Sequence, residues 1–350
     1  MIRWSALMVL VCLATAGGDA PAAPRASGCA DARRLACTGL YEGGAAGGRI
    51  ARGARFFSPG YRLWSDGLEK SRYIELPPGA RIDTSDVDEW TFPVGTKVWK
   101  EFRWRGRRIE TRYLEKLGAG SWRRTTFVWN EAGTEAFEER AGKTITLPGS
   151  TQRYDVPAEN DCGRCHDGRA DSVLGFEAIT LAAPAATGLT LARLDAEKLL
   201  TRPVERREAR IGGPLVAADA VGWLHVNCGV SCHNKSPAAS ASFLGLDLKL
   251  PVAAACDPTR APVATTTIDQ LTKSLGFRDA KAPRVRVVPG RPDESAVYVR
   301  ASSRAPTLAM PPLASHVVDA DGVAKLRLWI SALERSAKGA GPAAEGRARR

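Results

Sequence analysis

Two short segments of this 350-residue chain place a histidine directly after a pair of cysteines. The first reads Cys162-Gly163-Arg164-Cys165-His166, with two residues between its thiols. Thiols at this spacing can add to the vinyl groups of a porphyrin, and the adjacent imidazole is then placed to ligate the iron. The segment therefore predicts covalent attachment of haem c through Cys162 and Cys165, with His166 as the metal ligand.

The second segment runs from Cys228 to His233 and has three residues between Cys228 and Cys232. We expect a second haem on these two thiols, with His233 as ligand, provided that the intervening turn bulges. Attachment through Cys232 alone is one alternative, and a disulfide from Cys228 to Cys232 or to Cys256 is another. A zinc ion held by the four cysteines is a further alternative, but it would leave both adjacent histidines without a role.

Further iron ligands must come from a small set of side chains. Met310 is the only methionine after residue 8, and it precedes Pro311 and Pro312 on a segment expected to be rigid and extended. We expect Met310 to be the distal ligand of the second haem. For the first haem we expect His225, with His316 or an open position as the alternatives.

The first half of the chain has the pattern of antiparallel strands. Residues 61–130 hold six of the nine tryptophans. Apolar and polar residues alternate over 97–105 and 111–115, with a turn at Gly106, and residues 125–129 read as a third strand. Alternation places the aromatic side chains on one face, which favours core packing over a binding platform. We expect an antiparallel β-sandwich-like domain over residues 25–155.

The second half has the pattern of helices. Apolar residues recur at helical spacing over 191–200, after Thr190 as a cap, and over 217–226 and 321–333. Residues 156–215 are expected to carry the first attachment segment and a helical linker, and residues 216–335 a mainly α-helical, cytochrome c-like domain. The order of helix, attachment segment, long loop, methionine segment and last helix is typical of class I cytochromes c. Gly222 and Trp223 would then pack against Trp329. The fold class is α+β.

The two ends of the chain indicate its compartment. A basic start followed by a short apolar run predicts a signal peptide over residues 1–16, with cleavage as late as residue 24 as the alternative. Export to the periplasm or the cell exterior predicts a disulfide between Cys29 and Cys37. Residues 336–350 read as a disordered basic tail. No apolar run is long enough to span a bilayer, so no integral membrane segment is expected.

The chain resembles a family of exported dihaem c-type cytochromes from proteobacteria and myxobacteria, and the similarity covers about residues 37–334. The matching stretches are Leu63–Gly67, Phe92–Thr96, Trp99–Phe102, Glu110–Arg112, Val128–Asn130, Cys162–His166, Trp223–Cys228, Cys232–Asn234 and Met310–Leu313. Most members have two residues between the second pair of cysteines, whereas this chain has three. The resemblance implies electron transfer, with a periplasmic dehydrogenase as a conceivable partner.

Electron transfer between redox partner proteins is the function that the sequence favours, and an enzyme is the less favoured class. The formal net charge of +12 suits an acidic partner. Nothing in the sequence matches a nucleic-acid-binding module. One alternative is a dihaem peroxidase with an open distal site on the first haem. Another is a binding module, in which the β-domain recognises a polymer or protein and carries tethered haems.

Overall fold

The structure is a computed structural model that describes residues 29, 31, 33–44, 48–273 and 284–334. The expected signal peptide and the expected basic tail lie outside the described residues. The predicted disulfide between Cys29 and Cys37 is confirmed, with the two Cα atoms 5.4 Å apart. The bond links Cys29 to the short 3-10 helix η1, Leu35–Thr38, which contains Cys37.

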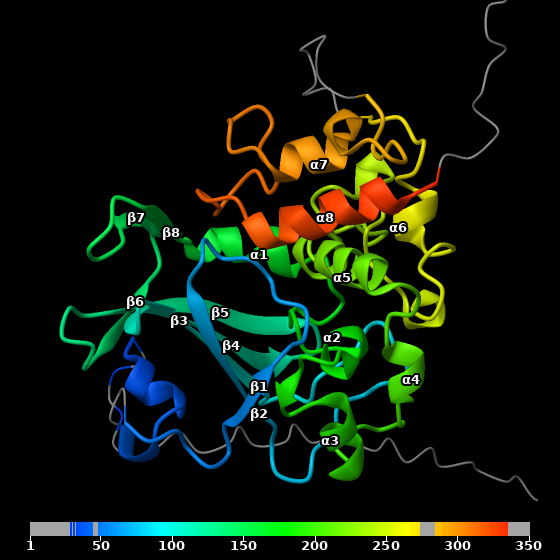
Figure 1. The fold of residues 1–350 in the computed structure, drawn as a ribbon. Coiled ribbons are helices and arrows are strands. Elements are labelled where there is room, and N and C mark those ends of the chain that lie inside the picture. Colours follow the sequence, from blue (N-terminus) through cyan, green and yellow to red (C-terminus); the bar gives the residue numbers. More distant parts are fainter. Residues whose placement is uncertain (1–28, 30, 32, 45–47, 274–283, 335–350) are drawn as a thin grey trace, which may run out of the picture.

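A seven-stranded antiparallel sheet is the largest element of the fold (Figure 1). Its order is β6-β5-β4-β3-β2-β1-β9. The strands are β1 (Arg55–Ser58), β2 (Glu69–Glu75), β3 (Lys97–Trp104), β4 (Arg107–Gly118), β5 (Ser121–Trp129), β6 (Ala136–Glu139) and β9 (Thr187–Gly188). A separate hairpin pairs β7 (Lys143–Thr146) with β8 (Arg153–Val156). The three predicted strands and the turn at Gly106 are therefore confirmed. Arg105 and Gly106 both have positive φ angles, of 47° and 78°, as a two-residue hairpin turn requires.

The two faces of the sheet are covered differently. On one face, Trp99, Tyr113, Phe127 and Trp129 pack with Leu35 into a small aromatic core. This confirms that alternation turns the strand aromatics into core residues. The opposite face packs partly against helices and partly against the β7–β8 hairpin, where Tyr154 and Val156 share a core with Phe102. Within the described residues the β-sandwich-like expectation is thus corrected to one large sheet covered on its second face by helices and by the small β7–β8 sheet, because the helices supply apolar cover that a sandwich takes from its second sheet.

The helical layer is built from short helices. They are α1 (Cys162–His166), α2 (Ala178–Ala182), α3 (Leu191–Ala196), α4 (Arg206–Ala209), α5 (Leu215–Leu224), α6 (Pro262–Thr265), α7 (Ala296–Ala301) and α8 (Ala320–Ala332). Short 3-10 turns lie at η2 (Glu42–Gly44), η3 (Glu159–Asp161), η5 (Ser242–Leu244), η6 (Val252–Ala254) and η7 (Pro292–Glu294), and η4 (His225–Gly229) is a π-turn. Thr190 caps α3 as expected, by accepting a hydrogen bond from the backbone of Arg193.

Helices α5 and α8 pack against each other, as expected for the first and last helices of the second half. Trp223 contacts α8 and packs against the core that contains Trp329, whereas Gly222 lies against another segment. Gly322 of α8 lies against the Trp223 indole, whose Nε1 donates to Asp319 Oδ2 at 2.7 Å. Gly222 instead faces Tyr61, where an added Cβ would come within 2.3 Å of the ring. The absence of a side chain at Gly222 therefore lets α5 approach the loop before β2.

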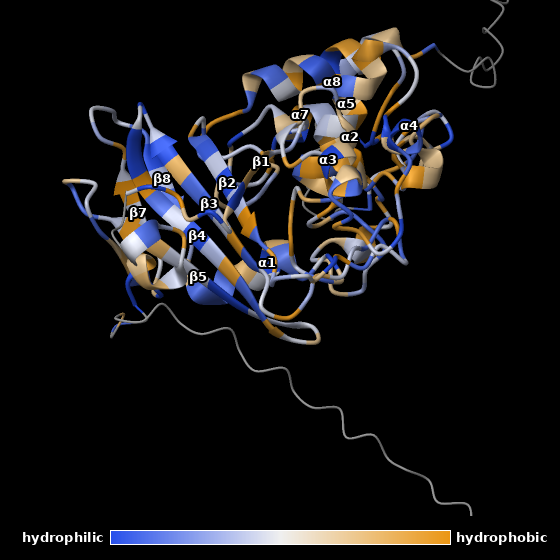
Figure 2. Ribbon diagram, turned by 90° about the horizontal axis from the view of Figure 1, so that it is seen from below, coloured by the Kyte–Doolittle hydropathy of each residue, from blue (hydrophilic) through white to orange (hydrophobic). Residues whose placement is uncertain are grey.

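One hydrophobic core joins the sheet to the helices. It contains Phe57 and Ile74 from the sheet, Leu224 from α5, and Leu326 and Ile330 from α8. Strand β9 comes from the expected linker region and pairs with β1, so this region is part of the sheet. Figure 2 shows the sheet and the helices side by side, with α1 next to the strands. Among the described residues, no helix has the length and apolar character needed to cross a membrane.

Candidate cofactor site

The first Cys-His segment forms helix α1, and its histidine is held by the loop that follows. His166 Nδ1 lies 2.5 Å from the backbone oxygen of Ser172. Since a carbonyl oxygen only accepts, Nδ1 carries the proton and Nε2 keeps its lone pair. A hydrogen bond from one ring nitrogen to a carbonyl is the usual way in which proteins orient a metal-ligating histidine.

The sheet fixes the loop that holds His166. Arg124 of β5 donates to Asp167 Oδ1 at 2.6 Å and to Ser172 Oγ at 2.7 Å. Asp171 accepts from Lys116 of β4 at 2.6 Å, and both side chains are 3% exposed. A buried pair of this kind sets the position of the loop more firmly than a surface pair would, because neither charge has water as an alternative partner. The strands therefore determine where the histidine ring points.

Burial and charge keep His166 neutral. Burial lowers its pKa to about 4; the hydrogen bond to Ser172 opposes this, and the charges of Lys100, Arg124 and Arg112 add to it. Cys165 and Cys162 are half-buried free thiols whose pKa values are raised, mainly by burial. Two unoxidised thiols and a neutral, oriented imidazole fit the requirements of covalent haem attachment at this segment.

The extra residue of the second segment is absorbed by a π-turn. Val230 N donates to His225 O at 2.9 Å, and His233 N donates to Cys228 O at 2.8 Å. Each bond spans five residues, where an α-helix spans four, so the turn widens by one residue. Cys232 N also donates to Cys228 O, at 3.2 Å, so the widened winding between the two cysteines is limited to the bond from His233.

The alternatives for the second segment can be compared with this geometry. Cys228, Cys232 and Cys256 are all free thiols, so neither alternative disulfide is formed. Within the described part of the chain, no three His, Cys, Asp or Glu side chains gather in a way that could hold a metal ion. A haem needs no such cluster, because the porphyrin supplies four of the iron ligands.

His233 lies buried at the end of the widened turn. Its side chain is 4% exposed, and Nδ1 has no hydrogen-bond partner among the described residues. Burial lowers its pKa to about 4, and the charges of Arg300 and Arg286 add to this effect. An unpaired nitrogen at such a depth costs free energy unless a ligand uses the ring.

Met310 reaches the same region through its backbone. Met310 N donates to Arg300 O at 3.1 Å, and Arg304 donates to Met310 O at 3.3 Å. Since Arg300 is close enough to His233 to lower the pKa of its imidazole, the Met310 segment and the second attachment segment share one neighbourhood. This arrangement is compatible with the expected distal role of Met310.

The two attachment segments contact each other. Cys232 Sγ lies 4.0 Å from the backbone oxygen of Arg164, and the charge of Cys232 influences the pKa of Cys165. An added Cβ on Gly168 would fall 2.0 Å from Ser231 O, so only glycine permits the approach. Segments more than 60 residues apart in the sequence are thus brought into one site.

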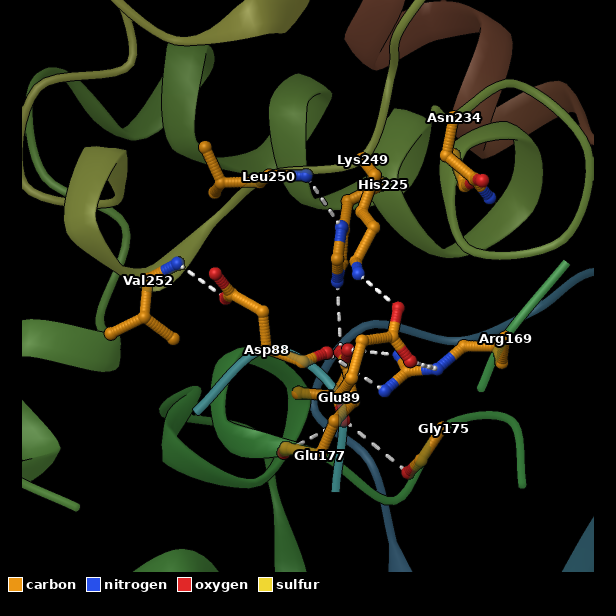
Figure 3. Close-up of polar contacts among 12 residues, drawn as sticks. Asp88, Glu89, Arg169, Gly175, Glu177, His225, Asn234, Lys249, Leu250 and Val252 are labelled. Atoms are coloured by element: carbon orange, nitrogen blue, oxygen red, sulfur yellow. Dashed lines mark hydrogen bonds and ion pairs between the residues drawn. The ribbon is translucent and has the colours of Figure 1, made fainter. Parts of the chain in front are cut away.

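His225 does not lie free beside the first segment. It is fully buried, its Nε2 contacts Glu177 Oε1 at 2.8 Å, and Leu250 N donates to its Nδ1 at 2.9 Å (Figure 3). Both ring nitrogens are committed to protein partners, so the expected distal role of His225 gains no support. His316, the alternative, has its Nε2 2.8 Å from Asp155 Oδ2.

His225 belongs instead to a buried network of charges that the sequence did not reveal (Figure 3). Arg169 donates to Glu177 Oε2 at 2.7 Å and lies 3.3 Å from Glu89, which also pairs with Lys249. Burial alone would raise the pKa of Glu177, but His225 and Arg169 outweigh it and hold the pKa well below its ordinary value. The network ties the loop before β3, the loop after α1 and the η4 region together.

A pocket lies where the sheet meets these elements. Its lining residues are Pro59, Tyr61, Leu63, Arg72, Lys100, Leu174, Gly175, Glu177, Val226 and Val230. Arg72 and Lys100 come from the sheet, and Val226 and Val230 from the second attachment region. Sequence reasoning missed both cations, because a polar residue that alternates with buried aromatics normally faces solvent. No protein-family model, curated protein or solved structure gives a match to this chain.

Proposed function

We propose that the protein is an exported dihaem c-type cytochrome that transfers electrons between redox partner proteins. The observation that carries the proposal is His166, whose Nδ1 is fixed on Ser172 O while its Nε2 remains available beside two free thiols. The C-x-x-C-H spacing supplies the chemical reason for this arrangement.

At the first segment, Cys162 and Cys165 would hold the haem and His166 would ligate its iron. When bound, haem supplies a one-electron ferric/ferrous couple. The protein residues orient the imidazole through Ser172 and hold the supporting loop on the sheet through Arg124 and Lys116. At the second segment, Cys228, Cys232 and His233 would play the same parts, and the widened turn supports that assignment.

The contact between the segments supports passage of electrons within the molecule. A methionine ligand raises the reduction potential of a haem, so Met310 at the second haem would direct electrons from the first haem to the second. The excess of 50 basic over 38 acidic residues would favour an acidic redox partner through charge steering. Export to the periplasm or the cell exterior is part of the proposal.

Intact mass and a pyridine haemochrome spectrum of the exported protein test the proposal. We expect two covalent haems in the wild type. The double variants Cys162→Ser/Cys165→Ser and Cys228→Ser/Cys232→Ser should each retain one, while Cys256→Ser should retain both as the matched control. A wild-type mass without haem would refute the function, and a single haem lost only with Cys162 and Cys165 would refute the second site.

A peroxidase remains the second candidate because the commitment of His225 leaves the distal position of the first haem unassigned. An open position would give a high-spin ferric spectrum and turnover of hydrogen peroxide. A fully low-spin spectrum without peroxide turnover would exclude the enzyme and leave electron transfer.

A further inference from the structure

Three basic residues form a row across the middle of the sheet. Arg72 on β2 pairs in register with Lys100 on β3, and Lys100 pairs in register with Arg112 on β4. Residues directly opposite one another on antiparallel strands share a face, with Cβ atoms about 5 Å apart. Because Val98 and Phe102, two residues either side of Lys100, belong to buried cores, the row lies on a covered face of the sheet.

Only one member of the row has a carboxylate partner. Arg112 pairs with Glu110 at 2.7 Å and lies over the Phe102 ring. Arg72 is 3% exposed and Lys100 is half-buried, and no ion pair or hydrogen bond joins either side chain to another described residue, although Lys100 Nζ lies 5.6 Å from the centre of the Phe102 ring. Like charges placed opposite each other are destabilising, and burial without a counter-charge adds to that cost.

The electrostatic cost lowers the pKa values of Lys100 and Arg72. Burial lowers the pKa of Lys100 to about 7, and the charges of Arg72 and Arg112 contribute to the decrease. Burial, with a contribution from Arg62, lowers the pKa of Arg72 to about 10. Both shifts are what a pair of cations shows when it lacks an anion.

The pocket that Arg72 and Lys100 line is otherwise mainly apolar. The apolar part of its wall comes from Pro59, Leu63, Leu174, Val226 and Val230. Glu177 also lines it, but its two carboxylate oxygens accept from Arg169 and His225. The lining thus combines two cations with apolar side chains, which is the chemistry that suits the carboxylate end of an otherwise apolar ligand.

The row also lies next to the first attachment segment. Lys100 and Arg112 are close enough to His166 and Cys165 for their charges to shift both pKa values. A porphyrin joined to Cys162 and Cys165 would therefore have the row within its surroundings. Its two propionates are the only anionic groups of the macrocycle.

We propose that Arg72 and Lys100 bind the propionate carboxylates of the haem at the first attachment segment. The propionates would then be the anionic partners that Arg72 and Lys100 lack among the described protein residues. This inference rests on the proposed function. It assigns two sheet residues to the cofactor, although neither lies near the Cys-His segments in the sequence.

The test uses the holoprotein with Arg72→Gln and Lys100→Met, and Lys143→Met on the exposed β7 hairpin as the matched control. The measurements are the haem count by intact mass and the midpoint potential of each haem by spectroelectrochemistry. Removing a cation beside a propionate favours the ferric state, so we expect two retained haems and a downward shift of one midpoint potential. Lys100→Arg should restore it, and the control should leave both unchanged.

Unchanged potentials in Arg72→Gln and Lys100→Met, with both haems retained, would overturn the assignment while leaving the cytochrome function intact. Absence of haem at Cys162 and Cys165 in the wild type would instead refute the function itself. If the neutral variants fail to fold, resonance Raman spectra of the conservative variants Arg72→Lys and Lys100→Arg test whether these side chains contact the propionates. A shifted propionate-bending band supports the contact, and an unchanged band contradicts it.

Discussion

Ser172 determines the chemistry of His166 although its side chain touches neither ring nitrogen. Its backbone oxygen accepts a hydrogen bond from Nδ1, and its φ of +57° lets the loop turn back toward the helix. The sequence identified His166 by its spacing from two cysteines, since that relation is local. It could not identify Ser172, because the contact depends on how Arg124 and Lys116 hold the loop on the sheet.

Met310 gives a prediction at the scale of one side chain. In Met310→Ala, we expect loss of the weak sulfur-to-iron charge-transfer band in the ferric absorption spectrum, because alanine offers iron no ligand. The potential of the second haem should fall as well. Persistence of the band in a variant that keeps both haems would show that another group ligates the iron.

Glu177 gives a prediction about stability and pH. Glu177→Gln removes the charge that faces Arg169, and breaking a buried ion pair costs about 3 to 5 kcal/mol of unfolding free energy. The folded-state pKa of Glu177 lies below its unfolded value of 4.5, so its contribution is full above pH 4.5 and declines as pH falls.

Urea unfolding of wild type and Glu177→Gln between pH 3 and pH 7 measures this difference. The stability gap should be constant above pH 4.5 and should narrow below it. A gap that is independent of pH over the whole range would contradict the assigned ion pair.

At the scale of elements, the π-turn η4 leads into the second Cys-His segment, and the bond from His233 N to Cys228 O continues the wider winding across it. Hydrophobic periodicity predicted α5, α8 and the strands, because each has a clear apolar face. It could not predict the π-turn, since one extra residue leaves no mark in a helical pattern. Likewise, Arg72 and Lys100 lie side by side because of the register between β2 and β3. The sequence of either strand alone does not give this register.

The contact between the loop after α1 and the second segment can be tested at Gly168. Gly168→Ala places a Cβ 2.0 Å from Ser231 O, so the backbones must separate, at a cost of about 1 to 3 kcal/mol. Gly118→Ala is the control, since its Cβ would meet only an ordinary contact at 3.9 Å. Thermal unfolding should distinguish the two, and equal melting temperatures would refute the close approach.

At the scale of the whole molecule, the sheet and the helices depend on each other for burial. Phe57 and Ile74 share a core with Leu224 and Ile330, and β9 adds a strand from beyond the first attachment segment. The change from strand-like to helical sequence patterns near residue 156 marked a change of secondary structure. It did not show how the parts pack, because a covered sheet face has the same alternation whether helices or strands cover it.

The shared core predicts that residues 25–155 do not form a stable domain when expressed alone. The fragment would lack β9 and would expose one apolar face of the sheet to water. We expect no cooperative unfolding transition by circular dichroism and a tendency to aggregate, while the full chain unfolds cooperatively. A fragment with a sharp transition would show that the sheet is independent of the helices.

The burial of Cys228 sets an order in time for the making of this protein. Burial raises the pKa of this thiol to about 12, so at neutral pH almost none of it is the reactive thiolate. A thiol in that state is poorly suited to forming a new bond. On the proposed function, we expect the bond to Cys228 to form while the chain is still open, before the final closure of sheet and helices. Haem added to a polypeptide that has already folded without it should then leave Cys228 unmodified, which intact mass would show.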